Sequence, residues 1–428
     1  MTTSRRQFLS RTAGSSMLLS LSPVVPNFLL STSVQAAAAK KQGEKILVVV
    51  QLSGGNDGLN TVIPIGDDIY HKSRFTVRVQ KEQALKIDDY LSFHPAMTGF
   101  AELLQNQQLA IVQGIGYPNP DRSHFSSMDI WHAGQRDVQA MRRLTGWLGR
   151  YLDSRAAPAA GGAVQAAVAG SLGDVPALHL GHERQPLAVV AENVRVPSIA
   201  SVDSFKLDAG GNAGLASAIS DSVNAPRSEA KENELLGFIQ QSTVTAIKSS
   251  DQLHDAMRNY QTDVNYPGTG LAKKLRTIAQ LIYAGMPTRI YYVSLEGFDT
   301  HANQAQVHAN QIRELSDACA AFIKDLKAHG QDERVLVLSF SEFGRRLKEN
   351  ASRGTDHGTA APLFLMGSKV KAGVLGAHPS LKDLDESGDP KHHTDFRQVY
   401  ATLLDQWLGG NSAAILGQKF EHVKVLKA

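Results

Sequence analysis

Three apolar, β-branched segments that each lead to an acidic residue constrain the fold of this chain more than any other feature. They are residues 45–52 leading to Asp57, residues 289–295 leading to Asp299, and residues 334–340 leading to Glu342. Near-continuous apolar segments of this length suit strands buried on both faces, as in a parallel sheet covered by helices. Ligands of such sheets bind beyond the carboxyl ends of the strands, so we expect the three acids to converge at one edge.

The segments between these strands have the period of amphipathic helices. In residues 311–329 the apolar side chains form one stripe, and Gly330 follows as a stop signal. The single cysteine, Cys319, lies in this stripe and is predicted to be a core residue. A second helix is expected from Leu271 to Ala284. The predicted fold is therefore α/β, with a doubly wound, mostly parallel sheet and helices on both faces.

The strand pattern is lost between about residues 156 and 266. This stretch contains an Ala/Gly-rich part, a Gly210-Gly211 turn and a long polar segment of helical period from Ser228 to Tyr260. We interpret it as an insertion or cap within one domain that spans residues 40–428.

The N-terminus has the composition of an export signal. Ser4-Arg5-Arg6-Gln7-Phe8-Leu9 precedes a moderately apolar stretch, residues 16–30, and a run of small residues, 34–39. The paired arginines before Phe-Leu resemble the twin-arginine signal. Two prolines interrupt the apolar stretch, which disfavours a membrane anchor. Residues 1–38 are predicted to be a cleaved signal peptide, with the twin-arginine translocase as partner, a periplasmic or extracellular location and no stable membrane span.

The charge balance disfavours nucleic acid as a partner. The chain has 44 Lys plus Arg and 41 Asp plus Glu, and three of the arginines precede Lys40, where no acid occurs. The remaining chain therefore carries 41 residues of each sign (44 − 3 = 41), and no polyanion-binding surface is expected. An exported redox protein is also disfavoured, because the sequence has no Cys-x-x-Cys and no convincing dinucleotide-binding fingerprint.

Four motifs carry side chains suited to chemistry. Asp57 lies in Ser-Gly-Gly-Asn-Asp-Gly after the first strand and could be a metal ligand or part of an ordinary turn. Ser123 lies at a predicted helix start, where it could be a cap or a nucleophile favoured by the helix-end N–H groups. Asp299 and His301, two residues apart at a strand end, could turn towards one Zn or Mn ion or form a hydrogen-bonded turn. The fourth motif comprises Ser-Glu-Phe-Gly-Arg-Arg at 341–346 and Gly-Thr-Asp-His-Gly at 354–358.

These motifs, in this order, resemble a known superfamily. Gly-Gly-Asn-Asp-Gly, Arg-Ser-His-Phe, Gly-Phe-Asp-Thr-His, Ser-Glu-Phe-Gly-Arg and Thr-Asp-His-Gly follow one another behind the signal. The order is similar to that of the alkaline phosphatase, sulfatase and cofactor-independent phosphoglycerate mutase superfamily, and more closely to its exported branch called domain of unknown function 1501. The resemblance implies an exported metal-dependent hydrolase that acts on a small-molecule or polymer phosphate or sulfate ester. The alternative is a non-catalytic exported binding or assembly protein that keeps the fold.

The resemblance also implies roles for individual residues. Ser123 matches the nucleophile, and Arg122 or Arg345 would pair with the non-bridging oxygens of the substrate. The expected first metal site, for Zn or Mn, consists of Asp299, His301 and His357. The expected second site, for Mg, Mn or Ca, is built on Asp57 and Glu342, with Asp356 as a further oxygen ligand.

One position departs from the superfamily pattern. Phe343 follows Glu342 where the superfamily has a metal-binding histidine, and phenylalanine cannot bind a metal. The second site is thereby left with oxygen ligands alone, a set that suits Mg or Ca better than Zn. Formylglycine chemistry is not expected, because neither Cys319 nor Ser123 is followed by the required Pro and Arg.

Overall fold

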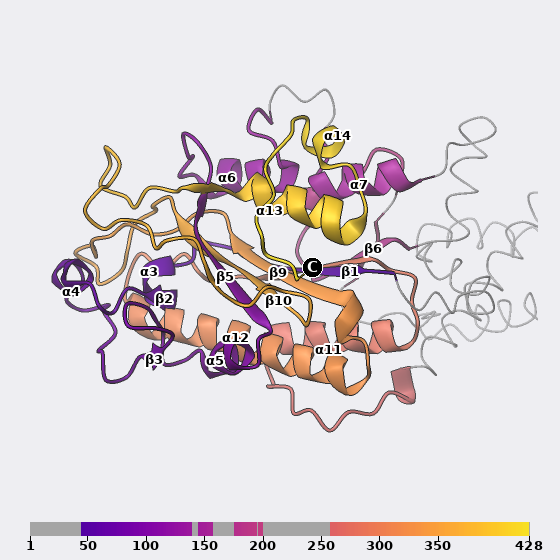
Figure 1. The fold of residues 1–428 in the computed structure, drawn as a ribbon, viewed down its shortest axis with the longest axis horizontal. Coiled ribbons are helices and arrows are strands. Elements are labelled where there is room, and N and C mark those ends of the chain that lie inside the picture. Colours follow the sequence, from indigo (N-terminus) through magenta and orange to yellow (C-terminus); the bar gives the residue numbers. More distant parts are fainter. Residues whose placement is uncertain (1–43, 139–143, 157–174, 195, 200–256, 428) are drawn as a thin grey trace, which may run out of the picture.

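The computed structural model describes residues 44–138, 144–156, 175–194, 196–199 and 257–427. Within these residues the core of the fold is a nine-stranded sheet in the order β11-β5-β10-β9-β1-β8-β6-β7, with β12 also paired to β5 (Figure 1). The strands are β1 (Ile46–Leu52), β5 (Leu109–Gly116), β6 (Ala177–Leu180), β7 (Ser198–Ile199), β8 (Ile290–Leu295), β9 (Val335–Ser341), β10 (Ala361–Met366), β11 (Gly373–Leu375) and β12 (Thr394–Asp395).

The middle of the sheet is parallel and buried on both faces. β1 lies between β8 and β9 and runs parallel to both, so that Val50 aligns with Val293 and with Ser339. β10 is antiparallel to its two neighbours. Side chains of β1 alternate between two cores, with Val48 in one and Leu47 in the other. The predicted α/β fold with a mostly parallel, doubly covered sheet is confirmed.

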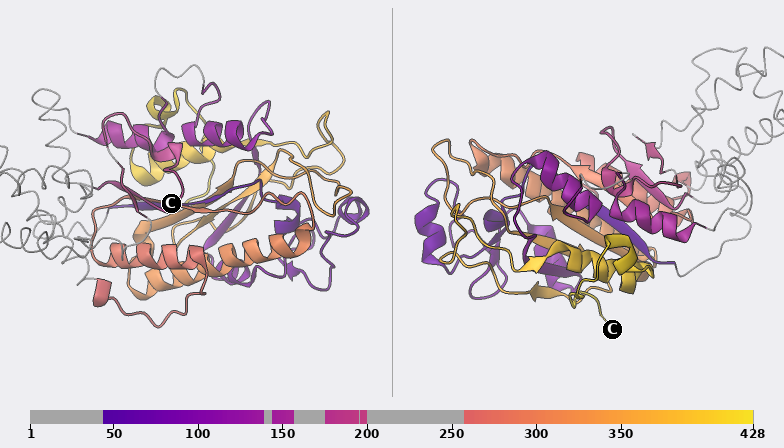
Figure 2. Two further views of the ribbon diagram at one scale, coloured as in Figure 1. Left: turned by 180° about the vertical axis from the view of Figure 1, so that it is seen from behind. Right: turned by 90° about the horizontal axis from the view of Figure 1, so that it is seen from above.

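Helices cover the two faces of the sheet, as Figures 1 and 2 show. One layer comprises α5 (Thr98–Gln105), α11 (Gly270–Tyr283) and α12 (Gln304–Ala328). The other comprises α6 (His124–Ala133), α7 (Trp147–Arg155), α13 (Phe396–Thr402), the π-helix η4 (Leu403–Leu408) and α14 (Ser412–Leu416). Both predicted helices are present, and Cys319 is buried in the core. α12 begins seven residues earlier than predicted, because its first two turns bury polar side chains such as Gln304 and His308.

A small unit follows β1 and borders the edge at which that strand ends. It contains α3 (Gly58–Thr61), α4 (Asp68–Ser73) and a three-stranded antiparallel sheet in the order β2-β4-β3. Its strands are β2 (Val62–Ile63), β3 (Leu85–Lys86) and β4 (Ser92–Phe93). Short 3-10 helices occur at η1 (Leu187–Val189) and η3 (Asp332–Arg334). The small unit matters for the site because it supplies Arg74, the residue that ends α4.

Part of the stretch predicted as an insertion belongs to the main sheet. β6 pairs in parallel with β8, and β7 pairs with β6. The sequence pattern did not reveal these strands because they are only four and two residues long. Most of the predicted cap, and the predicted signal peptide of residues 1–38, lie outside the described residues. Among the described helices, none combines the length and apolar character needed to cross a membrane.

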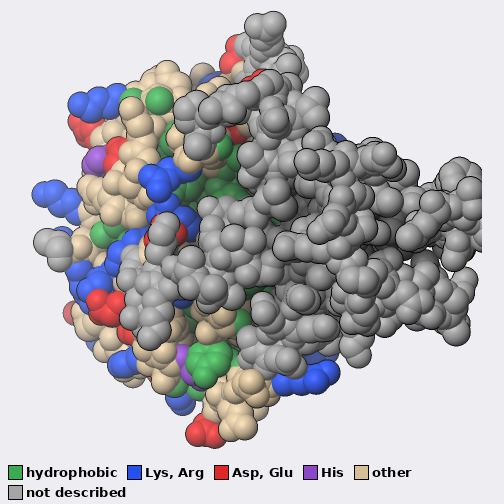
Figure 3. All heavy atoms as spheres, turned by 90° about the vertical axis from the view of Figure 1, so that its right-hand side faces the viewer, with side chains coloured by type: hydrophobic (Ala, Val, Ile, Leu, Met, Phe, Trp, Pro, Cys, Tyr) green, Lys and Arg blue, Asp and Glu red, His purple; other side chains and the backbone are tan. Residues whose placement is uncertain are grey.

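Figure 3 views the molecule from the side where β1 begins, opposite to the end that leads to Asp57. On the described part of this face, Lys and Arg side chains lie at separate places with acidic side chains among them. This dispersed arrangement agrees with the balanced charge of the sequence.

Candidate metal centre

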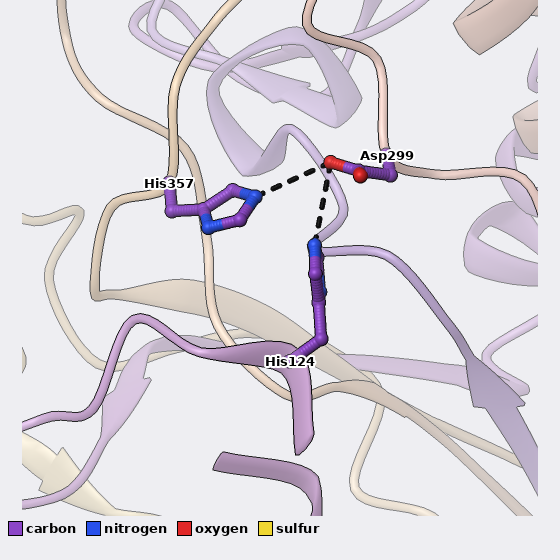
Figure 4. A group of neighbouring side chains, drawn as sticks. All are labelled: His124, Asp299 and His357. Carbon is purple, nitrogen blue, oxygen red and sulfur yellow. Dashed lines mark hydrogen bonds and ion pairs between the residues drawn. The ribbon is translucent and has the colours of Figure 1, made fainter. Parts of the chain in front are cut away.

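The carboxylate of Asp299 is the hub of the side-chain cluster at the strand ends. Its Oδ1 atom lies 3.1 Å from Nε2 of His301, 3.2 Å from Nε2 of His357 and 3.3 Å from Nε2 of His124. Figure 4 shows His124, Asp299 and His357 pointing towards one another from three separate segments. Their three ligand atoms lie within 4.8 Å of one another, and the group could hold a metal ion. Carboxylate oxygen and imidazole nitrogen form the mixed donor set that Zn or Mn accepts.

Each histidine comes from a different element. His124 is the first residue of α6, and His301 follows β8 in the loop that leads to α12. His357 is held by an isolated antiparallel bridge to Arg345. The Nε2 atoms of His301 and His357 are 2.9 Å apart. Two ring nitrogens so close must have a proton or a cation between them.

The outer nitrogen of each ring is bound by an oxygen atom. Nδ1 of His124 lies 2.8 Å from Oε1 of Glu342, and Nδ1 of His357 lies 2.8 Å from the carbonyl oxygen of Arg122. Nδ1 of His301 lies 3.2 Å from Oδ1 of Asp356. These oxygens can accept a hydrogen bond from each Nδ1, and in that tautomer each Nε2 would direct its lone pair towards Asp299. Three ring nitrogens and one carboxylate oxygen at these distances form a donor set that fits a metal ion.

The electrostatics of the cluster keep Asp299 ionised. Its partial burial opposes the charge, but hydrogen bonds from Arg345 and His357 outweigh this effect and lower the pKa of Asp299 to about 2. Burial lowers the pKa of His357, whereas the hydrogen bond to Glu342 raises the pKa of His124. Asp299 is thus a permanent anion at neutral pH.

The structure brings together the three residues predicted for the first metal site and adds a fourth. Asp299, His301 and His357 lie together, as expected. His124 was missed because the Arg-Ser-His-Phe motif was interpreted through its serine alone. The usable signal was a histidine at the start of a helix, next to a candidate nucleophile.

The residues predicted for the second site each have their own partners. Glu342 is buried, and its Oε1 accepts hydrogen bonds from the N–H of Gly54 and from His124, both at 2.8 Å. Asp356 contacts the outer nitrogen of His301. Asp57 is fully buried, and its Oδ2 lies 2.6 Å from Nη1 of Arg74. Each of these carboxylates thus has a different hydrogen-bond or ion-pair partner, and the shared oxygen site stays a prediction.

The two arginines predicted to bind substrate are engaged elsewhere. Arg345 is only 1% exposed and donates to the carbonyl oxygens of Gly55 and Thr355, and to Oδ1 of Asp299 at 2.8 Å. Arg122 binds Asp389 through Nε and Asp385 through Nη2, each at 2.9 Å. Both guanidinium groups are thus held by acceptors within the protein, and the expected contact of either with a substrate stays a prediction.

Ser123 lies where the sequence predicted, at the N-cap of α6. Its side chain is exposed, and among the described residues it makes no capping hydrogen bond. Its N–H donates to Oδ1 of Asp121 at 2.7 Å, which fixes the backbone. Ser127 is buried instead, and its hydroxyl donates to the carbonyl oxygen of Glu342 at 2.8 Å. Of these two serines, only Ser123 presents a hydroxyl to solvent.

Phe343 forms a wall of the cluster. Its side chain is buried, and its ring centroid lies 4.9 Å from that of His124 and 4.8 Å from that of His357. A Cβ atom at Gly55, which has a φ of +71°, would lie 2.4 Å from the Phe343 ring. A glycine at position 55 thus leaves room for the aromatic ring, which packs against the histidines without binding a metal.

Comparisons with known proteins give one family and several distant likenesses of fold. The family model described as "Protein of unknown function (DUF1501)" matches residues 44–413. No curated protein matches the chain. Similar solved structures include an alkaline phosphatase superfamily protein from Vibrio parahaemolyticus, with 8% identity, 88% of this chain and 71% of that chain covered, and a TM-score of 0.37.

Two further structures are similar at the same level. The PsFucS1 sulfatase from Pseudoalteromonas sp. is 14% identical to this chain, with a TM-score of 0.38. The match covers 92% of this chain and 74% of the sulfatase. The alkaline phosphatase from the Antarctic bacterium TAB5 is 14% identical to this chain, with a TM-score of 0.31. The match covers 76% of this chain and 92% of the phosphatase. Likenesses this distant carry no argument about the reaction.

Proposed function

Because the chain belongs to the DUF1501 family, as its ordered motifs predicted, we propose that it is a metal-dependent hydrolase of phosphate or sulfate esters with Ser123 as its nucleophile. The observation that carries this proposal is the convergence of three imidazole Nε2 atoms on Oδ1 of Asp299, next to an exposed serine at a helix start. A cluster of this composition beside a free hydroxyl is suited to displacement at a charged centre.

The first element of the proposal is a metal at the cluster. His124, His301 and His357 would hold it with Asp299, and their inward-facing lone pairs suit Zn or Mn. When bound, such an ion polarises an ester oxygen and favours the ionised form of a nearby hydroxyl. The protein residues behind the cluster, Glu342 and Asp356 among them, orient the rings.

The second element is attack by Ser123. Its Oγ would lose its proton and form a bond to the phosphorus or sulfur atom as the bond to the alcohol oxygen breaks, and the leaving alkoxide would gain a proton, so that an alcohol departs. Water would then break the ester on Ser123 and release phosphate or sulfate with the serine restored. N–H groups in the first turn of α6, which begins at His124, would stabilise the anionic oxygens.

The third element is the guanidinium of Arg346. Its side chain is 41% exposed, and its Nε lies 3.4 Å from the carbonyl oxygen of His357 and 3.7 Å from Oδ1 of Asp389. We propose that its exposed part pairs with the non-bridging oxygens of the ester, the role that the resemblance implied for Arg122 or Arg345.

A turnover assay tests the proposal. The purified mature chain, supplied with Zn or Mn, should hydrolyse an aryl phosphate or an aryl sulfate, and comparison of the two identifies the ester class. A chain with a filled metal site and no turnover of either ester would favour the non-catalytic binding or assembly protein instead.

We also propose export through the twin-arginine pathway, which rests on Arg5 and Arg6 in the sequence. Replacement of both arginines by lysine should trap the chain in the cytoplasm. Cell fractionation of the two forms checks this, and unchanged export of the Lys-Lys form would contradict it.

A further inference from the structure

We infer that this edge of the sheet takes one divalent ion and that Arg74 supplies the second positive charge, at Asp57. The inference rests on the proposed function and deepens it by fixing the number of ions. It disagrees with the two-ion site expected from the resemblance, since Asp57, a residue assigned there to the second ion, already pairs with the guanidinium of Arg74.

The pair formed by Asp57 and Arg74 is completely enclosed. Both side chains are 0% exposed, and Nη1 of Arg74 lies 2.6 Å from Oδ2 of Asp57. The same guanidinium donates to Asn60 Oδ1 at 2.9 Å, to the carbonyl oxygen of Leu347 at 3.0 Å and to that of Arg346 at 2.8 Å. These four acceptors hold the guanidinium of Arg74 in place. Without it, the carboxylate of Asp57 would be buried without a partner of opposite charge.

The charge at this position is already balanced. Burial opposes ionisation of Asp57, but Arg74 outweighs this effect and keeps its pKa below the ordinary value. The neighbouring His308 is neutral, because burial lowers its pKa to about 3. Gln304 also donates to Oδ2 of Asp57. The negative charge of Asp57 is thus balanced by the positive charge of Arg74. A divalent ion placed here would be repelled by Arg74.

Of the buried oxygen atoms on the carboxylates assigned to a second ion, Oδ1 of Asp57 alone has no hydrogen-bond partner among the described residues. Mg and Ca take six or more oxygen ligands. Both oxygens of Glu342 accept hydrogen bonds, from Gly54 and His124 at Oε1 and from Ser341 at Oε2.

Metal stoichiometry tests this inference without any reliance on activity. The mature protein is freed of metal by chelation and titrated separately with Zn, Mn, Mg and Ca by calorimetry, with elemental analysis of the dialysed product. We expect saturation at one ion per chain. Asp57→Asn should keep that stoichiometry and bind within about threefold of the parent, because its side chain is not a ligand.

Asp299→Asn is the matched control, and it should weaken binding at least tenfold. Two ions per chain in the parent, falling to one in Asp57→Asn, would overturn the inference while leaving the proposed function in place. A parent that binds no divalent ion would overturn both. Melting curves of the two Asn variants confirm that each is folded before titration.

Discussion

Nδ1 of His124 lies 2.8 Å from Oε1 of Glu342, so the acid that follows β9 orients the ring that α6 presents to Asp299. This contact joins two motifs that are 218 residues apart in the sequence. We infer that Glu342 is a positioning residue behind the candidate metal centre, where the resemblance implied a metal ligand.

Replacing Glu342 by Gln should therefore weaken metal binding without unfolding the protein. Loss of the charged acceptor leaves Nδ1 of His124 poorly held, and such outer partners are worth about 10–100-fold in affinity. Titration calorimetry measures the change. Glu349→Gln is the control, because that carboxylate accepts N–H bonds from Thr76 and Val77 instead. Equal affinities in the two variants would contradict the role of Glu342.

His124→Ala should lower metal affinity at least tenfold, since one of the converging nitrogens is removed. His422→Ala should leave affinity unchanged, because that ring contacts Asp405 and Gln406. Elemental analysis of both variants after dialysis gives the comparison. Full metal occupancy in His124→Ala would exclude His124 from the centre.

Ser123→Ala should abolish ester hydrolysis, a loss of several orders of magnitude, and should retain the metal. Ser123 is exposed and directly precedes His124 in the chain, and removal of its hydroxyl leaves the ring nitrogens in place. Ser126→Ala is the matched control, one turn along α6. Activity that survives in Ser123→Ala and disappears in Ser126→Ala would assign the nucleophile to the other serine.

Phe343→His should lower stability and leave the number of bound ions at one. The ring is buried against two histidines, so a polar nitrogen placed there without a partner costs about 1–3 kcal/mol. Denaturant unfolding and metal titration report the two effects. Phe343→Leu keeps the wall apolar and controls for the change in shape. A second bound ion in Phe343→His alone would mean that position 343 can complete a metal site.

The pair Asp57 and Arg74 should show strong coupling in a double-mutant cycle. Arg74→Met leaves a buried carboxylate unpaired and should cost about 3–5 kcal/mol of unfolding free energy. The double variant Asp57→Asn with Arg74→Met removes both charges and should be more stable than Arg74→Met alone. Denaturant unfolding of the four proteins gives the coupling. Additive losses would mean that the pair carries no net interaction.

Much of the fold follows from local patterns in the sequence. The strands that end before Asp57, Asp299 and Glu342 form three adjacent central strands, since apolar segments of this length are stable only when both faces are covered. The short strands β6 and β7 escaped prediction because four and two residues carry no readable period. The family was also predicted from the sequence, because the order of the five motifs along the chain does not depend on the tertiary structure.

Patterns in the sequence therefore predicted the central strands, the two helices α11 and α12, and three of the four residues that meet at Asp299. The tertiary structure alone decided how those residues are used: Asp57 pairs with Arg74, Glu342 supports His124, and the guanidinium of Arg345 binds backbone carbonyls. The physical reason is that strand and helix patterns are set by neighbours in the chain. The partner of a buried charge depends instead on where the loops bring residues from distant segments, and on the need to satisfy every buried polar group.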